Sequence, residues 1–165
     1  LRGEGHFVAL LRRKGYLDLS VHDDYAPEPN ANLKVFTDFV RENLTVEFGS
    51  NIASFGDRLY LKPPGSPDLK GLKVLRPGLY LGTIKKNRFE PSRGLALALK
   101  KESFQRILDL SSGSREILNY LKGETLNVTG DKGWTGVCVD GFSVGWGKQL
   151  GGILKNHYPK GWRII

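Results

Sequence analysis

Hydrophobic residues recur along the chain in short runs, and the spacing within the clearest run predicts a helix. Its apolar positions recur mostly at intervals of three or four residues: Leu33, Phe36, Phe39, Val40 and Leu44. This spacing places the side chains on one face of a helix, so it predicts an amphipathic helix packed on a core. Either Asn30 or Asn32 has a side chain suited to cap the first turn of this helix.

Shorter apolar runs predict strands and two further helices. The expected strands span residues 6–12, 45–48, 52–55, 58–62, 72–75, 79–84, 134–139, 142–146 and 153–155. Ser92 and Ser114 each precede a short helical pattern, and Gly123 follows the second pattern as a left-handed terminating residue. Asp140-Gly141 predicts a tight hairpin, because a type I′ turn requires positive φ at both central residues.

The segment PPGSPDLKG at residues 63–71 marks the main predicted boundary within the chain. It holds three prolines and two glycines in nine residues, a composition typical of a loop. Several short strands, frequent glycines and two short helices follow it and favour a small, partly open β-barrel. The sequence therefore predicts an α+β protein, with a leading segment 1–15, a small α/β module 16–71 and the barrel 72–165.

Positive charge is concentrated in the second part of the chain. The chain has a formal net charge of +8, yet residues 16–60 carry three basic and eight acidic side chains. Residues 61–165 carry eighteen basic and eight acidic side chains. This excess favours a polyanionic partner, although lysines that only keep a surface soluble would give the same count.

Two segments combine this charge with side chains suited to RNA. Residues 85–93 hold four basic side chains and one acid. Residues 145–163 hold four basic side chains and no acid, with two tryptophans, one tyrosine and one histidine. Bases attract phosphate, and flat side chains stack on unpaired nucleobases. The candidate RNA-binding residues are Lys85, Lys86, Arg88, Arg93, Lys148, Lys155, His157, Tyr158, Lys160, Trp162 and Arg163, with Tyr158 and Trp162 as the candidates for stacking.

Signals for catalysis and metal binding are weak in the sequence. Gly147-Lys148 resembles the end of a phosphate-binding loop, but residue 149 is glutamine and the required upstream glycine is missing. Cys138 lies in a predicted strand and is expected to be a buried structural residue. His157 has no obvious acidic partner to orient it for catalysis. One cysteine and three spread histidines do not supply a typical zinc site, so no catalytic or metal-binding residue is predicted.

Further features of the sequence bear on the extent of the polypeptide and on its cellular compartment. Methionine is absent, even at position 1, so we expect the chain to begin inside a longer polypeptide. A single cysteine and the lack of a signal-peptide pattern favour a reducing compartment, which we expect to be the cytoplasm. The sequence also holds no run of eighteen apolar residues, which argues against a membrane span.

Several of these segments resemble one known family. GLYLGTIKKNRFEPSRGLALAL (78–99), YLKGETL (120–126) and GWGKQLGGILKNHYPKGWR (145–163) are similar to the PUA-like RNA-binding domain of RsmF-type five-methylcytosine RNA methyltransferases, in the Nol/Nop/Sun group. GEGHFVALLRRKG (3–15) resembles the last strand of their methyltransferase domain, and residues 16–71 occupy the position of their first C-terminal domain. At Arg93-Gly94 the sequence departs from the histidine and alanine that the family often has there.

The resemblance implies a function that this chain does not complete by itself. The S-adenosylmethionine site and the pair of catalytic cysteines of the family lie upstream, and Cys138 matches neither cysteine motif. Implied partners are RNA, mostly small-subunit rRNA, and the catalytic domain of the same polypeptide. Two hypotheses follow: a module that positions RNA for that domain, or a structural module that packs on it and binds little RNA. The second predicts exposed apolar area on the isolated chain. Residues 145–163 also allow a simpler interpretation, in which Trp146 and Trp162 belong to the core and the lysines are solvated.

Overall fold

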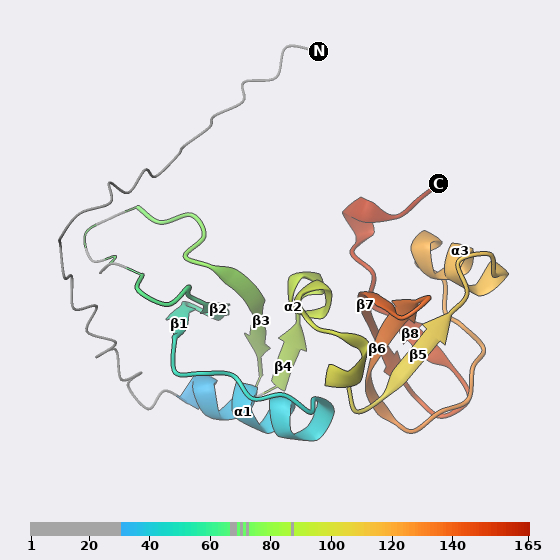
Figure 1. Cartoon of the computed structure of the whole chain (residues 1–165), viewed down its shortest axis with the longest axis horizontal. Coiled ribbons are helices and arrows are strands. Elements are labelled where there is room, and N and C mark those ends of the chain that lie inside the picture. The colour runs from blue at the N-terminus through green and yellow to red at the C-terminus, as the bar shows by residue number, and fades with distance from the viewer. Residues whose placement is uncertain (1–30, 67–68, 70, 72, 87) are drawn as a thin grey trace, which may run out of the picture.

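The computed structural model describes residues 31–66, 69, 71, 73–86 and 88–165. The expected strand at residues 6–12 and the candidate cap Asn30 lie outside the described residues. Within those residues the chain folds into two four-stranded sheets and three α-helices, which confirms the predicted α+β class (Figure 1).

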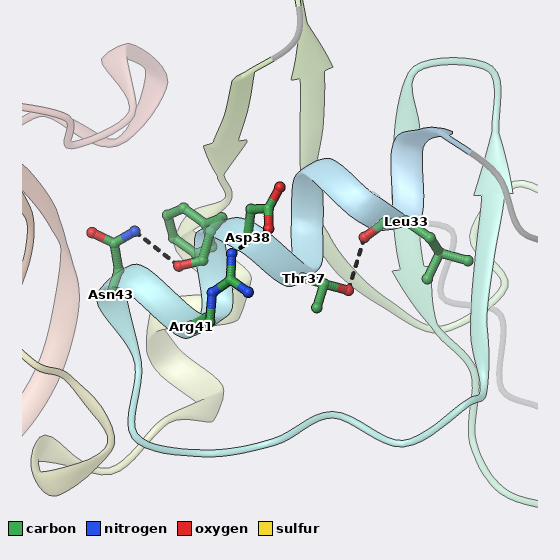
Figure 2. Close-up of polar contacts among 6 residues, drawn as sticks. Leu33, Thr37, Asp38, Arg41 and Asn43 are labelled. Atoms are coloured by element: carbon green, nitrogen blue, oxygen red, sulfur yellow. Dashed lines mark hydrogen bonds and ion pairs between the residues drawn. The ribbon is translucent and has the colours of Figure 1, made fainter.

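The first helix, α1 (Ala31–Asn43), follows the predicted apolar stripe. Phe36 and Phe39 on its inner face are 1% and 5% exposed. Figure 2 shows polar contacts along the helix, including the bond from the Asn43 amide Nδ2 to the Phe39 carbonyl oxygen at 2.8 Å. Because the helix begins at Ala31, Asn32 lies in its first turn and is not the residue that caps it.

The C-terminal end of α1 is held by the segment that leads into the second sheet. The Arg106 guanidinium donates to the Glu42 carbonyl oxygen and to the Asn43 Oδ1, both at 3.2 Å. The Gln105 amide donates to the carbonyl oxygens of Arg41 and Leu44, both at 3.1 Å. These donors satisfy carbonyl groups that a helix leaves unpaired at its end.

The first sheet is an antiparallel meander in the order β1-β2-β3-β4. Its strands are β1 (Ile52–Phe55), β2 (Arg58–Leu61), β3 (Leu79–Lys85) and β4 (Arg88–Pro91). The predicted boundary at residues 63–71 falls in the connection between β2 and β3. Since those two strands pair directly, with Tyr60 opposite Tyr80, a division after residue 71 cuts through one sheet.

Two of the expected strands are not strands in the structure. Residues 45–48 form a loop, in which the Thr45 amide donates to the Ser103 carbonyl oxygen at 2.9 Å. Val46 and Phe48 pack on the core from this loop. The alternation of apolar and polar residues that predicted a strand here therefore reflects burial of two side chains and not pairing with a sheet. Residues 73–75, the described part of the expected strand 72–75, also have no strand structure.

The second sheet has the order β5-β6-β7-β8 and is not closed into a barrel. Between the sheets lie α2 (Arg93–Ala98) and the 3₁₀ turn η1 (Lys101–Ser103). The remaining elements are β5 (Ile107–Leu110), α3 (Arg115–Lys122), β6 (Gly133–Val139), β7 (Phe142–Gln149), β8 (Leu154–Asn156) and the 3₁₀ turn η2 (Lys160–Trp162). The pair β5–β6 is parallel, connected through α3, and the other pairs are antiparallel.

The predicted helix ends at Ser92, Ser114 and Gly123 and the predicted hairpin turn are confirmed. The Ser92 hydroxyl accepts from the Leu95 amide at 3.0 Å, and the Ser114 hydroxyl caps α3 in the same way. Gly123 ends α3 in the left-handed conformation at φ 86°. Asp140 and Gly141 both have positive φ, at 48° and 86°, as the type I′ turn requires.

The larger hydrophobic core is shared by both sheets. Trp146 of β7 is 2% exposed and packs against Phe39 of α1 and Phe104 before β5, with ring centroids 5.9 and 5.0 Å away. Phe89 of β4 belongs to the same core. A smaller core lies between α3 and the second sheet, around Tyr120. The shared core holds the two sheets together.

Candidate nucleic-acid interface

The most concentrated basic site lies on β7 and β8. Lys148 and Lys155 are directly opposite each other in the antiparallel pairing, so their side chains share one face of the sheet. Trp134 of β6 is in turn opposite Lys148, and the Lys148 ammonium lies 5.6 Å from the centre of its indole ring. Two like charges in this position repel each other by a few tenths of a kcal/mol to about 1 kcal/mol. A bound anion would relieve that repulsion.

His157 completes this row from the segment after β8. Its ring meets Trp134 edge to face, with the centroids 4.5 Å apart. The pKa of His157 is lowered because the ring is desolvated against its neighbours and because Lys155 and Lys148 are close, while Glu90 acts in the opposite direction. The imidazole is therefore neutral near pH 7 in the free protein and is able to accept or donate a hydrogen bond.

The β3–β4 hairpin brings two more predicted residues, Lys85 and Arg88, but both are paired with an acid. Glu90 lies 2.7 Å from the Lys85 ammonium and 3.6 Å from the Arg88 guanidinium. The hydrogen bond from Lys85, the strongest influence on Glu90, lowers the pKa of the carboxyl, and the same bond raises the pKa of Lys85. These two cations are thus partly neutralised, which the count of charges in residues 85–93 did not reveal.

Arg93 lies in a different setting, at the start of α2. Its Nε donates to the Val144 carbonyl oxygen of β7 at 3.1 Å. The guanidinium carbon is 5.2 Å from the centre of the Tyr158 ring and 4.8 Å from that of Trp162. Tyr158 is only 7% exposed, because it packs on Tyr120 in the smaller core. The expectation that Tyr158 stacks on a base is therefore wrong, while Trp162, which is 65% exposed, keeps that possibility.

The remaining candidates differ in how accessible they are. Lys86, in the turn after β3, and Lys160, at the start of η2, are exposed. Arg163 is half-buried and packs beside Gly123 at the C-terminal end of α3, where its Nη2 donates to the Tyr158 carbonyl oxygen at 3.4 Å. A cation in that place also interacts favourably with the helix dipole, so Arg163 has a structural role.

Cys138 and the pair Gly147-Lys148 lie within strands of the second sheet. Burial raises the pKa of the Cys138 thiol to about 11, as expected for a structural cysteine in β6. Gly147 and Lys148 lie inside β7 and precede no helix, so they form no phosphate loop. Among the described residues there is no cluster of three or more potential metal ligands, and no helix in that part of the chain is long and apolar enough to cross a membrane.

Two residues of the basic site were not singled out from the sequence. Trp134 carries Lys148 and His157 against its ring, but its position in an ordinary strand pattern gave no sign of this. Glu90 was counted only as the one acid among four bases. Glu90 lies diagonally opposite Lys85 on the paired strands β3 and β4, a relation that could not be seen because β4 was not predicted.

Comparison with known protein families gives two matches along the chain. Residues 38–99 match the RsmF rRNA methyltransferase first C-terminal domain, and residues 108–164 match the methyltransferase RsmF PUA domain. Together these matches cover most of the chain. The chain belongs to the RsmF family and corresponds to the C-terminal region of its members. The suspected family is thereby confirmed, and residues 1–15, with their likeness to a catalytic-domain strand, lie outside both matches.

The first match ends at residue 99 and the second begins at residue 108, whereas the boundary predicted from the sequence falls after residue 71. The first C-terminal domain, as matched, contains Glu90 and Arg93, and the PUA domain contains Trp134, Lys148 and the other residues of the second sheet. The Glu90 carboxylate influences the pKa of His157, and Arg93 bonds to β7. The basic site around Lys148 and Lys155 and the group around Arg93 and Trp162 therefore both lie where the two RsmF domains meet.

Proposed function

We propose that this chain is the RNA-binding part of an S-adenosylmethionine-dependent rRNA cytosine five-methyltransferase, which holds small-subunit rRNA for an upstream catalytic domain. The cofactor belongs to that catalytic domain, and the reaction takes place in the cytoplasm. The family match supports an accessory part of an rRNA methyltransferase. RNA contact is the step that the geometry of the basic site supports.

One observation carries the proposal: Lys148 and Lys155 share one face of a sheet edge beside an aromatic ring. The sheet gains nothing from two ammonium groups opposite each other, so the arrangement is explained best by an anionic partner. Trp134 and His157 give this site a flat floor and a group able to bond a phosphate or ribose oxygen. Lys86 and Lys160, both exposed, extend the positive charge beyond this site.

The proposal predicts a definite dependence on salt. If about four phosphates are neutralised, the logarithm of the association constant should fall with the logarithm of salt concentration at a slope of roughly −3 to −4. Such phosphate contacts fix the orientation of the RNA and carry little sequence information. Recognition of the target nucleotide then belongs mainly to the catalytic domain.

The experiment is a salt titration of binding to a small-subunit rRNA helix, with two charge-reversal variants. Lys155→Glu changes an exposed residue of the basic site, and Lys34→Glu makes the same change in charge on the exposed side of α1. We expect Lys155→Glu to weaken binding at least about tenfold at low salt and Lys34→Glu about twofold or less. Equal effects of the two variants, or binding by the wild-type chain that does not respond to salt, would overturn the proposal.

A structural role on the catalytic domain is the second candidate, and one feature favours it. A groove of about 610 Å³ lies between α1 and the segment that follows it, with mostly apolar side chains along its wall. Val40 and Phe48 line the groove and are only partly buried. Under this role a Phe48→Glu variant would lose affinity for a separately produced catalytic domain and keep its affinity for RNA. The same variant would leave both affinities unchanged if RNA positioning is the whole function.

A further inference from the structure

A column of packed side chains runs from the smaller core to the surface and ends at Trp162. Tyr120, which is fully buried, meets Tyr158 with ring centroids 5.4 Å apart. The Arg93 guanidinium lies over Tyr158 and under Trp162, 5.2 and 4.8 Å from the two ring centres. Trp162 is the last member of the column and remains 65% exposed.

The base of the column is fixed by hydrogen bonds. The Tyr120 hydroxyl donates to the Trp146 carbonyl oxygen at 2.9 Å, and the Arg93 Nε donates to the Val144 carbonyl oxygen at 3.1 Å. Both acceptors belong to β7. The guanidinium is therefore held in place by the sheet before any ligand arrives.

The backbone of Trp162 is also anchored on both sides. Its amide donates to the Pro159 carbonyl oxygen at 3.0 Å within η2, and the Ile164 amide donates to the Leu121 carbonyl oxygen at 3.2 Å. An exposed indole on an anchored segment, with a cation beneath it, loses little conformational freedom when a flat ligand binds. Lys160 lies at the start of the same turn and is exposed, so a phosphate next to that ligand has a cation within the same segment.

We propose that Trp162 stacks on an unpaired nucleobase of the bound RNA, and that Arg93 positions the indole for this contact. The inference rests on the proposed RNA-binding function and adds to it the class of nucleotide that this surface takes. Every nucleobase has a face on which an aromatic ring stacks, so the contact selects an unpaired base in a bulge, loop or end without selecting its identity. The basic site at Lys148 and Lys155 binds phosphate, and Trp162 binds a nucleobase only if that base is unpaired.

The experiment compares two RNA hairpins that differ only in one three-nucleotide bulge, which carries 2-aminopurine in its middle position. Binding to the whole chain is measured by anisotropy of an end label, and stacking by quenching of the 2-aminopurine fluorescence. Trp162→Ala should weaken binding of the bulged RNA roughly ten- to hundredfold and abolish the quenching, with only a small effect on the paired RNA. Trp162→Phe keeps a flat face and should retain much of both.

Arg93→Lys tests the positioning role, because it keeps the charge and removes the planar group. We expect weaker quenching and a loss of roughly three- to tenfold for the bulged RNA, with an unchanged slope against salt and unchanged affinity for the paired RNA. Near-ultraviolet circular dichroism and the melting temperature show whether the variant is folded. If Arg93→Lys quenches and binds as the wild type does, the positioning role is excluded.

Failure of this inference is distinguishable from failure of the proposed function. If the wild type binds both hairpins, Lys155→Glu loses both, and Trp162→Ala binds the bulged RNA as the wild type does, the stacking inference is overturned while RNA binding stands. If Trp162→Ala lowers the affinity for both hairpins equally, Trp162 makes a general contact and the inference is again overturned. If the wild type binds neither hairpin, RNA binding and the inference fall together, and Trp162 would be tested as a contact with the catalytic domain.

Discussion

The indole Nε1 of Trp146 donates a hydrogen bond to the carbonyl oxygen of Ser92, with 2.9 Å between the two atoms. Trp146 lies in the matched PUA domain, and Ser92 caps α2 in the matched first C-terminal domain. The bond thus joins the two domains inside their shared core. Arg106 also holds the end of α1 from the start of the second sheet, so we expect the two domains to unfold as one cooperative unit.

The Trp146→Phe variant tests this cooperativity. The change removes the bond to Ser92 and leaves space in the core, so we expect the free energy of unfolding to fall by about 2–4 kcal/mol. Wild type and variant should each unfold in urea in a single transition, with the same midpoint by far-ultraviolet circular dichroism and by fluorescence of the remaining tryptophans. Two separated transitions in the wild type would show that the domains unfold independently.

Glu90→Gln should strengthen RNA binding. The change frees Lys85 and Arg88 from their shared carboxylate, so both cations become available to phosphate. We expect the dissociation constant to fall about two- to fivefold, and the slope against salt to become steeper by about one. Affinity measured across salt for the small-subunit rRNA helix checks both values.

Asp109→Asn is the matched control for this prediction. Asp109 is paired with the Lys101 ammonium at 2.6 Å, so the variant also frees a lysine and changes the net charge equally. It lies on β5, away from the paired Lys148 and Lys155 in the order of the sheet. If Asp109→Asn strengthens binding as much as Glu90→Gln does, the gain comes from net charge and not from the β3–β4 hairpin.

The sequence predicted correctly those parts of the fold that depend on residues close together in the chain. The strand 52–55 and the caps Ser92, Ser114 and Gly123 were predicted as observed, because their geometry depends on neighbouring residues. The strand β4 was missed, since the residues Arg88–Pro91 include two charges and a proline and form a strand only by pairing with β3. The strand β5 was missed for a similar reason, because its parallel partner β6 follows a whole helix later.

The candidate site shows the same limit. Charge and aromatic content pointed to Lys148, Lys155 and Trp162, all of which remain at least partly accessible. Burial of Tyr158 depends on Tyr120, which lies far from it in the sequence, so composition alone made it look like Trp162. The pairing of Lys148 with Trp134 depends on the register of β6 and β7, which no periodicity reveals.

Cys138 should react slowly with thiol reagents in the folded protein. Burial raises its pKa to about 11 from an ordinary value of 9.0, which lowers the reactive thiolate fraction at pH 7.5 by roughly a hundredfold. The reaction with a chromogenic disulfide should accelerate at least that much when the protein is unfolded in urea. A native rate close to the unfolded rate would mean that β6 opens readily or that the thiol is accessible.

Gly123→Ala should destabilise the end of α3 and the segment after η2. Gly123 has φ 86°, and an added Cβ would lie 2.2 Å from the Arg163 Nε, so the substitution is strained and displaces Arg163. We expect a loss of about 1–3 kcal/mol in the free energy of unfolding, measured by urea denaturation. Gly113→Ala, where an added Cβ meets nothing within 4 Å, is the control and should change stability little.

RNA binding should tighten as the pH falls from 7.5 to 5.5, through His157. The pKa of His157 is lowered in the free, folded protein. The neutral ring therefore contributes its full stabilisation above the pKa of the unfolded chain, near 6.5. This stabilisation is lost as the pH falls through the pKa of the folded protein. An RNA phosphate bound near Lys148 and Lys155 offsets their positive charge and raises the pKa of His157. RNA binding is therefore accompanied by uptake of a proton. The affinity of the wild type for RNA should therefore be higher at pH 5.5 than at pH 7.5. His157→Gln retains the other two histidines of the sequence and should bind with nearly constant affinity over this range; an equal pH dependence in that variant would assign the proton to another group.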